Sequence, residues 1–191
     1  MSKVGGRDRL LESAHKAFAF EGFDRVGVAQ ILQSAGVQAP TLYHHFGDKE
    51  GLYSEWATLV LTDLGDRIAQ ATGSATTLLQ SLEGIGVVLL GQLDFDLRQL
   101  LKDTERLAKP SSRERVLGAY LKALYNPLYG ALVRSVGRGE LRADSVGLMA
   151  EAFLGGAQNL TRHAKRSPEA SAEIAAWWAR AFLGGVARIH G

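Results

Sequence analysis

Apolar residues recur at helical spacing along almost the whole chain, and no stretch alternates apolar and polar residues for long enough to indicate a β-sheet. In the first such segment, one helical face carries Leu10, Leu11, Ala14, Ala17 and Phe18. This periodicity limits the chain to an all-α fold, for which we expect about nine helices.

Capping residues place the ends of these helices. Gly22 is suited to end the first helix, Pro40 to stand in the first turn of the third, and Asp48 to be the N-cap of the fourth. Asp96 and Ser111 are each followed three residues later by Gln or Glu, which is the pattern of a capping box. The expected helices cover roughly 7–20, 28–34, 39–45, 49–70, 77–91, 96–107, 111–137, 144–165 and 167–189.

Three further positions refine these boundaries. Thr76 or Thr77 should open the helix that ends near Gly91, and Asp144 should open the next-to-last helix. Pro127 lies inside the expected helix over 111–137, where its ring removes one hydrogen bond and clashes with the preceding turn. We therefore expect a kink at Asn126-Pro127.

Composition excludes several classes of protein. The chain has 191 residues, 46% of them hydrophobic, and contains no cysteine, which excludes disulfides, thiolate metal sites and a cysteine nucleophile. Its most apolar run, 85–90, is far shorter than the roughly 20 residues that a membrane span needs. No apolar signal region follows the first residues. We expect a soluble, cytoplasmic protein without a membrane segment.

Residues 27–49, GVAQILQSAGVQAPTLYHHFGDK, have the pattern of a helix-turn-helix: two short helices joined by a glycine-containing turn. Leu42 and Phe46 should point inward, which leaves Gln38, Thr41 and the Tyr and His side chains outside. Such side chains can contact base edges in a major groove, although a merely solvated helix face explains them equally well. The first fifty residues hold six basic and six acidic residues, so their net charge does not by itself indicate a nucleic-acid binder.

The segment from about Arg9 to Tyr53 resembles the amino-terminal DNA-binding domain of the TetR (tetracycline-repressor) family of bacterial transcriptional regulators. The likeness is carried by LLESAHKAFAFEGF and by ILQSAGVQAPTLYHHFGDKEGLY. It implies a DNA-binding domain over 1–48 and a helical ligand-binding and dimerisation domain over 49–191. It also implies a homodimer that binds a palindromic double-stranded DNA operator and is released by a small-molecule effector. An activator would have the same sequence pattern.

The resemblance also assigns residues to the DNA interface. It places Gln38, Ala39, Pro40, Thr41, Tyr43 and His44 on the recognition helix, and Lys49 on the DNA backbone. The chain departs from the family at Gly27, where a hydroxyl side chain is usual, and at the helix cap Gln38, where serine is usual. Arg25, Lys49 and the basic arm that contains Lys3 must then supply the phosphate contacts. We expect modest, strongly salt-dependent DNA affinity.

Motifs for catalysis are missing from the sequence. No two of the five histidines are four residues apart, so a helical zinc pair is absent. Val133 stands where a nucleophile elbow needs glycine, and Leu89 where a dinucleotide-binding loop needs its third glycine. We therefore expect no enzyme activity, no metal and no cofactor. A helical small-molecule-binding module with weak or no DNA specificity remains the alternative.

A ligand cavity is expected among the fourth to eighth helices. Large apolar and tyrosine side chains there suit a mostly hydrophobic ligand with one or two polar atoms. For any one of them, ordinary packing in the core is the simpler explanation. The candidates are Trp56, Leu59, Phe95, Tyr120, Leu124, Tyr125, Tyr129 and Phe153.

The sequence AFLGG occurs twice, ending at Gly156 and at Gly185. Paired glycines in a helix interior lower helix propensity, but they allow two helix backbones to approach closely. They predict a tight crossing of the last two helices, within the subunit or across a dimer interface. The expected dimer contacts are Gly155, Gly156, Leu160, Trp177, Trp178, Phe182, Gly184 and Gly185.

Overall fold

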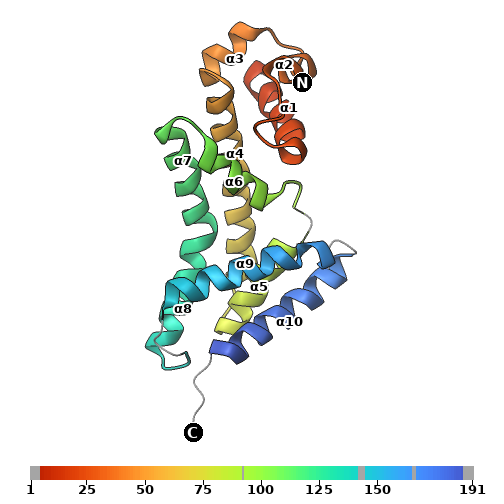
Figure 1. The fold of residues 1–191 in the computed structure, drawn as a ribbon. Helices are drawn as coiled ribbons and strands as arrows, with labels where there is room; N and C mark the ends of the chain where they lie inside the picture. The colour runs from red at the N-terminus through yellow and green to blue at the C-terminus, as the bar shows by residue number, and fades with distance from the viewer. Residues whose placement is uncertain (1–4, 92, 142–144, 165–166, 187–191) are drawn as a thin grey trace. The chain divides into compact units, whose positions relative to one another are not determined.

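The computed structural model describes residues 5–91, 93–141, 145–164 and 167–186 (Figure 1). These residues form an all-α fold without a β-strand, as the periodicity predicts. The chain runs through α1 (Gly6–Glu21), α2 (Val28–Ala35), α3 (Ala39–Phe46), α4 (Lys49–Thr72), α5 (Leu78–Leu90), α6 (Leu97–Arg106), α7 (Pro110–Tyr120), the π-helical segment η1 (Leu121–Tyr125), α8 (Asn126–Gly137), α9 (Val146–Ala164) and α10 (Pro168–Val186).

By packing, the chain divides into two compact units. The first unit comprises 1–62 and 94–120, and the second comprises 63–93 and 121–191. The expected division at residue 48 concerns function rather than packing, and it stays a prediction. Among the described helices, none is long and apolar enough to cross a membrane.

The core of the first unit forms where α1 packs on α2 and α3. Leu10 and Phe18 of α1, Ile31 of α2 and Leu42 of α3 are all buried there. An aromatic cluster continues this core toward α4, where the ring of Tyr53 lies 5.0 Å from Phe18 and 5.3 Å from Trp56. Burying these rings stabilises the unit by roughly 1.5–3 kcal/mol for each large side chain.

The helix ends confirm most of the predicted caps. Gly22 ends α1 with a φ of 78°, a conformation that only glycine adopts readily. The Asp48 carboxylate accepts from the Gly51 N–H at 2.9 Å at the start of α4. Thr77 opens α5 with a complete capping box, and the Asp96 side chain caps α6. Asp144 and Lys3 lie outside the described residues.

Two predictions about the helix over 111–137 have different outcomes. The capping box of Ser111 and Glu114 is wrong, because Pro110 is already the first helical residue and Ser111 therefore lies inside the first turn. The kink predicted at Asn126-Pro127 stays a prediction, but the helix changes type just before Pro127. The segment Leu121–Tyr125 is π-helical and directly precedes the turn that contains Pro127. Inserting an extra residue per turn is one way a helix accommodates a proline.

The core of the second unit lies between α5, α9 and α10. Leu82, Ile85 and Leu89 of α5 are buried, together with Ala175 and Ala179 of α10. A β-carbon on Gly86 would lie 3.1 Å from the Cβ of Ala175, so α5 and α10 are close at this point. In Figure 1 the two helices run side by side.

Candidate nucleic-acid interface and ligand-binding regions

Helices α2 and α3 form a helix-turn-helix within the first unit. The turn depends on Gly36, which has a φ of 61° and a ψ of 40° in the left-handed region. Its N–H and that of Val37 donate to carbonyls at the end of α2, including that of Leu32, at 3.2 Å. Ile31 and Leu42 anchor the two helices in the core. The polar side of α3 is thereby directed away from the core.

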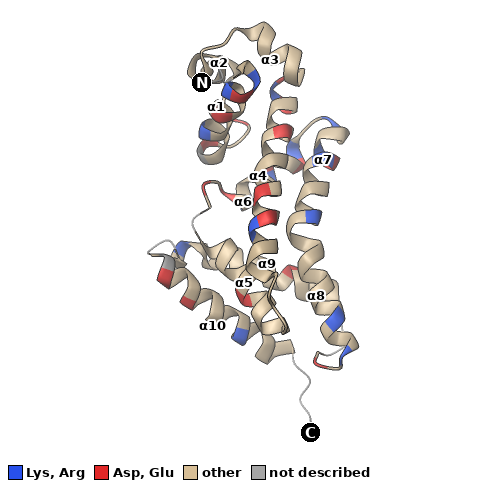
Figure 2. Cartoon of the chain, turned by 180° about the vertical axis from the view of Figure 1, so that it is seen from behind, with Lys and Arg blue, Asp and Glu red and all other residues tan. Residues whose placement is uncertain are grey.

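The outward face of α3 carries hydrogen-bonding groups but no charge. Gln38, Pro40, Tyr43 and His44 are exposed, and Tyr43 has an exposed fraction of 54%. Figure 2 shows α3 free of acidic and basic residues, in contrast to α1 and α4. His45 is also exposed, and its ring lies 5.0 Å from that of His44. This face can donate to and accept from base edges, but it cannot attract phosphate by charge.

Two of the predicted recognition residues are only half-exposed, namely Ala39 and Thr41. A β-carbon on Gly6 would lie 2.9 Å from the Cγ2 of Thr41, so the start of α1 packs against this side chain. Thr41 is therefore partly engaged in holding α3 to α1. The other outward residues of α3 are more accessible.

The two predicted phosphate contacts have different surroundings. Arg25 is exposed in the loop before α2. The ammonium of Lys49 lies 4.2 Å above the centroid of the Phe23 ring, and burial lowers its pKa, opposed by the nearby Asp24 and Asp103. Contact with a phosphate would require Lys49 to leave this ring.

Neither helix of the motif has a side-chain cap at its N-terminus. Gly27 precedes α2 and Gln38 precedes α3, and neither makes a side-chain hydrogen bond to the first turn. The N–H groups at the start of α2 therefore lack a side-chain acceptor, whereas in α3 Pro40 has no N–H and the Thr41 N–H donates to the Gln38 carbonyl at 3.0 Å. Helix N-termini attract anions, so the N–H groups of α2 are suited to phosphate oxygens of a DNA backbone.

Two buried carboxylates hold this motif in place, and the sequence analysis missed both. Asp103 of α6 accepts from the Phe23 N–H at 2.8 Å and from the Gln99 side chain at 2.7 Å. Glu50 of α4 accepts from the N–H groups of Ala108 and Lys109 at 3.0 and 2.7 Å. Asp103 shares the buried face of α6 with Leu97 and Leu100, and an acid on an apolar face is a signal that the sequence does contain.

Asp48 connects the start of α4 to the start of α7. Its carboxylate forms an ion pair with Lys109 in addition to capping α4. Burial alone would raise the pKa of Asp48, but the hydrogen bonds from Lys109 and from the Gly51 N–H outweigh it and lower the pKa overall. The carboxylate is therefore charged at neutral pH.

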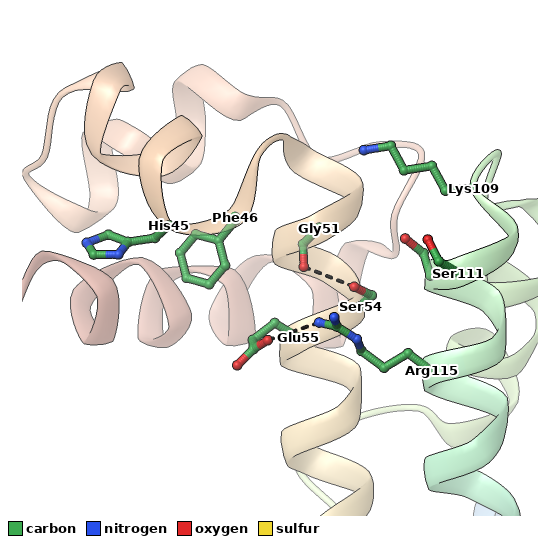
Figure 3. Close-up of a pocket in the computed structure, with 9 residues that line it drawn as sticks. His45, Phe46, Gly51, Ser54, Glu55, Lys109, Ser111 and Arg115 are labelled. Atoms are coloured by element: carbon green, nitrogen blue, oxygen red, sulfur yellow. Dashed lines mark hydrogen bonds and ion pairs between the residues drawn. The ribbon is translucent and has the colours of Figure 1, made fainter.

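A polar pocket of about 240 Å³ lies within the first unit, between the end of α3, the start of α4 and the start of α7 (Figure 3). Glu55 forms ion pairs with Arg7 and with Arg115, the latter at 3.2 Å. In Figure 3 the side chains of Glu55 and Arg115 approach each other across the pocket. The lining consists of His45, Phe46, Gly51, Ser54, Glu55, Lys109, Ser111, Ser112 and Arg115.

The predicted ligand-binding residues fall in both compact units. In the first unit, Trp56 is buried and donates from Nε1 to Nδ1 of His15 at 3.1 Å, Phe95 is buried, Tyr120 is half-buried, and Leu59 is 47% exposed. In the second unit, Leu124 and Phe153 are fully buried, and Tyr125 stacks on the exposed Tyr129 at 5.8 Å. Core packing accounts for the buried members of both groups.

The predicted dimer contacts also divide into two groups. Gly156, Trp178 and Phe182 pack inside the second unit: a β-carbon on Gly156 would lie 2.2 Å from the Trp178 ring, and this ring's N–H donates to the Phe153 carbonyl at 3.1 Å. Leu160 packs on a buried cluster formed by Leu90, Ala164 and Ala175. The accessible candidates are Gly155, Trp177, Gly184 and Gly185, and Trp177 is 56% exposed. Within the subunit, Gly156 makes room for the Trp178 ring rather than for a second helix backbone, and a β-carbon on Gly155, Gly184 or Gly185 would contact nothing, so a crossing through the glycine pairs stays a prediction for the dimer interface.

Comparison with known proteins bears on this arrangement. Residues 10–56 match the model for bacterial regulatory proteins of the tetR family. The chain is 38% identical to the HTH-type transcriptional repressor KstR2 of Mycolicibacterium smegmatis over 79 residues. This alignment covers 41% of this chain and 38% of that protein. It is also 41% identical to the HTH-type transcriptional repressor ComR of Escherichia coli over 51 residues. That alignment covers 27% of this chain and 24% of that protein.

The fold has close counterparts along almost its whole length. The TetR-family transcriptional regulator PfmR of Thermus thermophilus superposes with a TM-score of 0.71 and 26% identity, over 93% of this chain and 98% of that one. All these names describe transcriptional regulators and none describes an enzyme. The sequence matches to KstR2 and ComR span less than half of those proteins, so their repressor activity is carried over to this chain only as a proposal.

Proposed function

This chain carries the amino-terminal domain of the TetR family of bacterial regulatory proteins, and on that basis we propose that it is a transcriptional repressor that binds a palindromic DNA operator as a homodimer. The observation that carries the proposal is the orientation of α3. Its apolar residue Leu42 is fully buried, whereas Gln38, Tyr43 and His44 face outward. A short polar helix held in this way fits a major groove.

Base contacts and phosphate contacts come from different parts of this surface. The uncharged face of α3 is suited to base edges, with Gln38, Tyr43 and His44 as donors and acceptors. The uncapped first turn of α2 and the exposed Arg25 are suited to phosphates. Few cations take part, so we expect a modest affinity, and it should depend strongly on salt, with a log–log slope of about −0.9 for each phosphate neutralised.

Homodimerisation follows from the need to contact two half-sites. Two recognition helices must reach successive major grooves about 34–36 Å apart, which a two-fold dimer provides. We propose that the accessible residues of the last two helices, Gly155, Trp177, Gly184 and Gly185, form the dimer contact. An exposed tryptophan beside small residues is suited to insertion into a partner's groove.

We further propose that a small, mostly hydrophobic effector releases the DNA. Asp103 connects α6 to the loop after α1, and Glu50 connects α4 to the start of α7. A displacement of α6 would therefore be passed to the helix-turn-helix through a buried hydrogen bond. An effector can shift the equilibrium only by its difference in affinity for the two states.

The test is DNA binding by the full chain, measured by fluorescence anisotropy with the DNA that flanks its own coding region. We expect sequence-preferring binding that Tyr43→Ala weakens at least about tenfold, because a base or sugar contact is lost. Tyr129→Ala also removes an exposed tyrosine, but from α8, and it should leave the affinity within about twofold. Weak association that is equal on all sequences and indifferent to Tyr43→Ala would support a plain small-molecule-binding module instead.

A further inference from the structure

We propose that the polar pocket between α3, α4 and α7 is a binding site for a small oxyanion, a phosphate or a compound of similar size that ends in a phosphate group. The pocket lies inside the first unit and does not depend on DNA binding. Its volume of about 240 Å³ is below the usual range for drug-sized ligands, about 300–1,000 Å³. A ligand of few atoms fits this space.

The chemical class follows from the hydrogen-bonding groups that the chain leaves unused. Among the described residues, the hydroxyls of Ser111 and Ser112 have no hydrogen-bond partner, and Ser112 is only 6% exposed. In the described part of the chain no buried side-chain oxygen or nitrogen lacks a partner, so these two hydroxyls open onto the pocket and are free to donate to an acceptor that enters it. In Figure 3 Ser111 lies between Lys109 and Arg115, at the start of α7.

The charged groups of the lining also have donors to spare. Arg115 has five N–H groups in its guanidinium and uses Nη1 for Glu55, while Lys109 has three and uses one for Asp48. The acceptors are already engaged: the two Glu55 oxygens by Arg7 and Arg115, and the Gly51 carbonyl by the Ser54 hydroxyl at 3.1 Å. The remaining capacity is almost entirely for donation, which calls for an acceptor-rich ligand.

The charged side chains around the pocket also favour an anionic ligand. The charged residues that line the pocket are Glu55, Lys109 and Arg115, and the charge of Glu55 is also countered by Arg7 from α1. Asp48 and Glu50 do not line the pocket, and their oxygens accept from the N–H groups of Gly51, Ala108 and Lys109. The first turn of α7 adds the positive end of a helix dipole. Bidentate contact with a guanidinium is the usual way in which proteins hold a phosphate.

The test uses inorganic phosphate and the full chain without DNA, in isothermal titration calorimetry against sodium chloride of equal ionic strength. We expect saturable binding at one site with a dissociation constant of about 1–10 mM. Arg115→Gln should weaken it at least about tenfold, and Ser111→Ala combined with Ser112→Ala about fivefold.

Arg106→Gln is the matched control. Arg106 and Arg115 have side chains that are 53% and 55% exposed, and each forms an ion pair at 3.2 Å, but Arg106 is not part of the pocket lining. Its replacement should leave phosphate affinity within about twofold. Circular dichroism checks folding, and if Arg115→Gln does not fold, the double serine variant decides.

Three outcomes would overturn the proposal. Heats that chloride reproduces would show only an ionic-strength effect. Equal affinities of Arg115→Gln and the unchanged chain would place the anion elsewhere. Amide shifts of Ser111 and Ser112 in NMR spectra that respond to duplex DNA but not to inorganic phosphate would identify the pocket wall as part of a DNA-backbone contact.

Discussion

Inside each of the two compact units of this chain, a different kind of contact connects the helices. In the first unit, buried polar groups connect helices that are distant in sequence: Asp103 to Phe23, Glu50 to Lys109 and the Tyr53 hydroxyl to the Leu100 carbonyl. In the second unit, glycines make room for neighbouring helices: Gly86 lets α5 approach Ala175, and Gly156 accommodates the Trp178 ring. Hydrogen bonds fix the orientation of the helices that they connect, whereas close packing fixes the size of the side chains that the core can hold.

The difference has a consequence for function. The unit that carries the helix-turn-helix must hold α3 in one orientation, and directional hydrogen bonds serve that purpose. The second unit contains Leu124 and Phe153, both candidates for contact with an effector, in a mainly apolar core, where hydrogen bonds such as that from Trp178 to the Phe153 carbonyl accompany the close packing. Four substitutions, two in each unit, test this contrast.

Asp103→Ala should have the largest effect on stability. It leaves the Phe23 N–H and the Gln99 amide without their acceptor, and we expect the free energy of unfolding to fall by about 3 kcal/mol. Urea denaturation measures it. Glu105→Ala removes an exposed acid from the same helix and should cost less than about 0.5 kcal/mol. Equal stability of the two variants would show that the polar contacts of the first unit are dispensable.

Gly156→Ala should lower the stability of the second unit by about 2 kcal/mol, because its methyl group would overlap the Trp178 ring. The neighbouring Gly155 has open space around its Cα, so Gly155→Ala should raise stability by about 0.5–1 kcal/mol through helix propensity. Thermal unfolding of both variants gives opposite shifts in Tm. If both variants are stabilised, the second unit tolerates changes of volume and the contrast between the units fails.

Asp48→Ala should cost about 1 kcal/mol at neutral pH, the usual value of an N-cap. The exposed ion pair with Lys109 adds little to this. Because the folded pKa of Asp48 is lowered, its stabilisation is fully present above the ordinary pKa of aspartate and is lost as the pH falls through the folded pKa. Denaturation at several pH values should therefore show the two proteins converging in acid. A difference that stays constant into acid would contradict the cap.

Arg180→Gln should have the smallest effect. Arg180 of α10 and Glu83 of α5 form an exposed ion pair at 3.6 Å in the second unit. Pairs of this kind contribute less than about 0.5 kcal/mol, and salt screens them. Denaturation at low and high salt measures the effect. A cost above about 1 kcal/mol, on the scale of a buried hydrogen bond, would mean that polar contacts matter in both units.

Local patterns predicted most of the fold. Helical periodicity identified the helices, and Gly22, Asp48, Thr77 and Asp96 marked their ends, because caps involve residues only a few positions apart. Ser111 was misassigned as a cap because Pro110 begins α7. The sequence contains two residues suited to begin this helix, a proline and a serine, and only the three-dimensional path of the chain decides which of them is its first residue.

The site was less predictable because its contacts join distant segments. Asp103 lies 80 residues from its partner Phe23, and Arg115 lies 60 residues from Glu55. No periodicity connects such pairs. The glycine pairs predicted a close crossing, but only the rotation of α9 about its axis directs Gly156 rather than Gly155 toward Trp178. The outward residues of α3 were predictable because Leu42 and Phe46 mark the opposite side of a single helix.

The outward side chains of α3 form no hydrogen bonds within the described part of the chain: Gln38, Tyr43 and His44 are free of such obligations. They can be exchanged without loss of a buried partner, and none of them is a lysine, an arginine, an aspartate or a glutamate. Under the proposed function, the choice of DNA target would therefore be uncoupled from folding. A library randomised at these three positions alone should yield stable proteins with new operator preferences. This short helix is therefore suited to engineering of the DNA sequence that the protein binds.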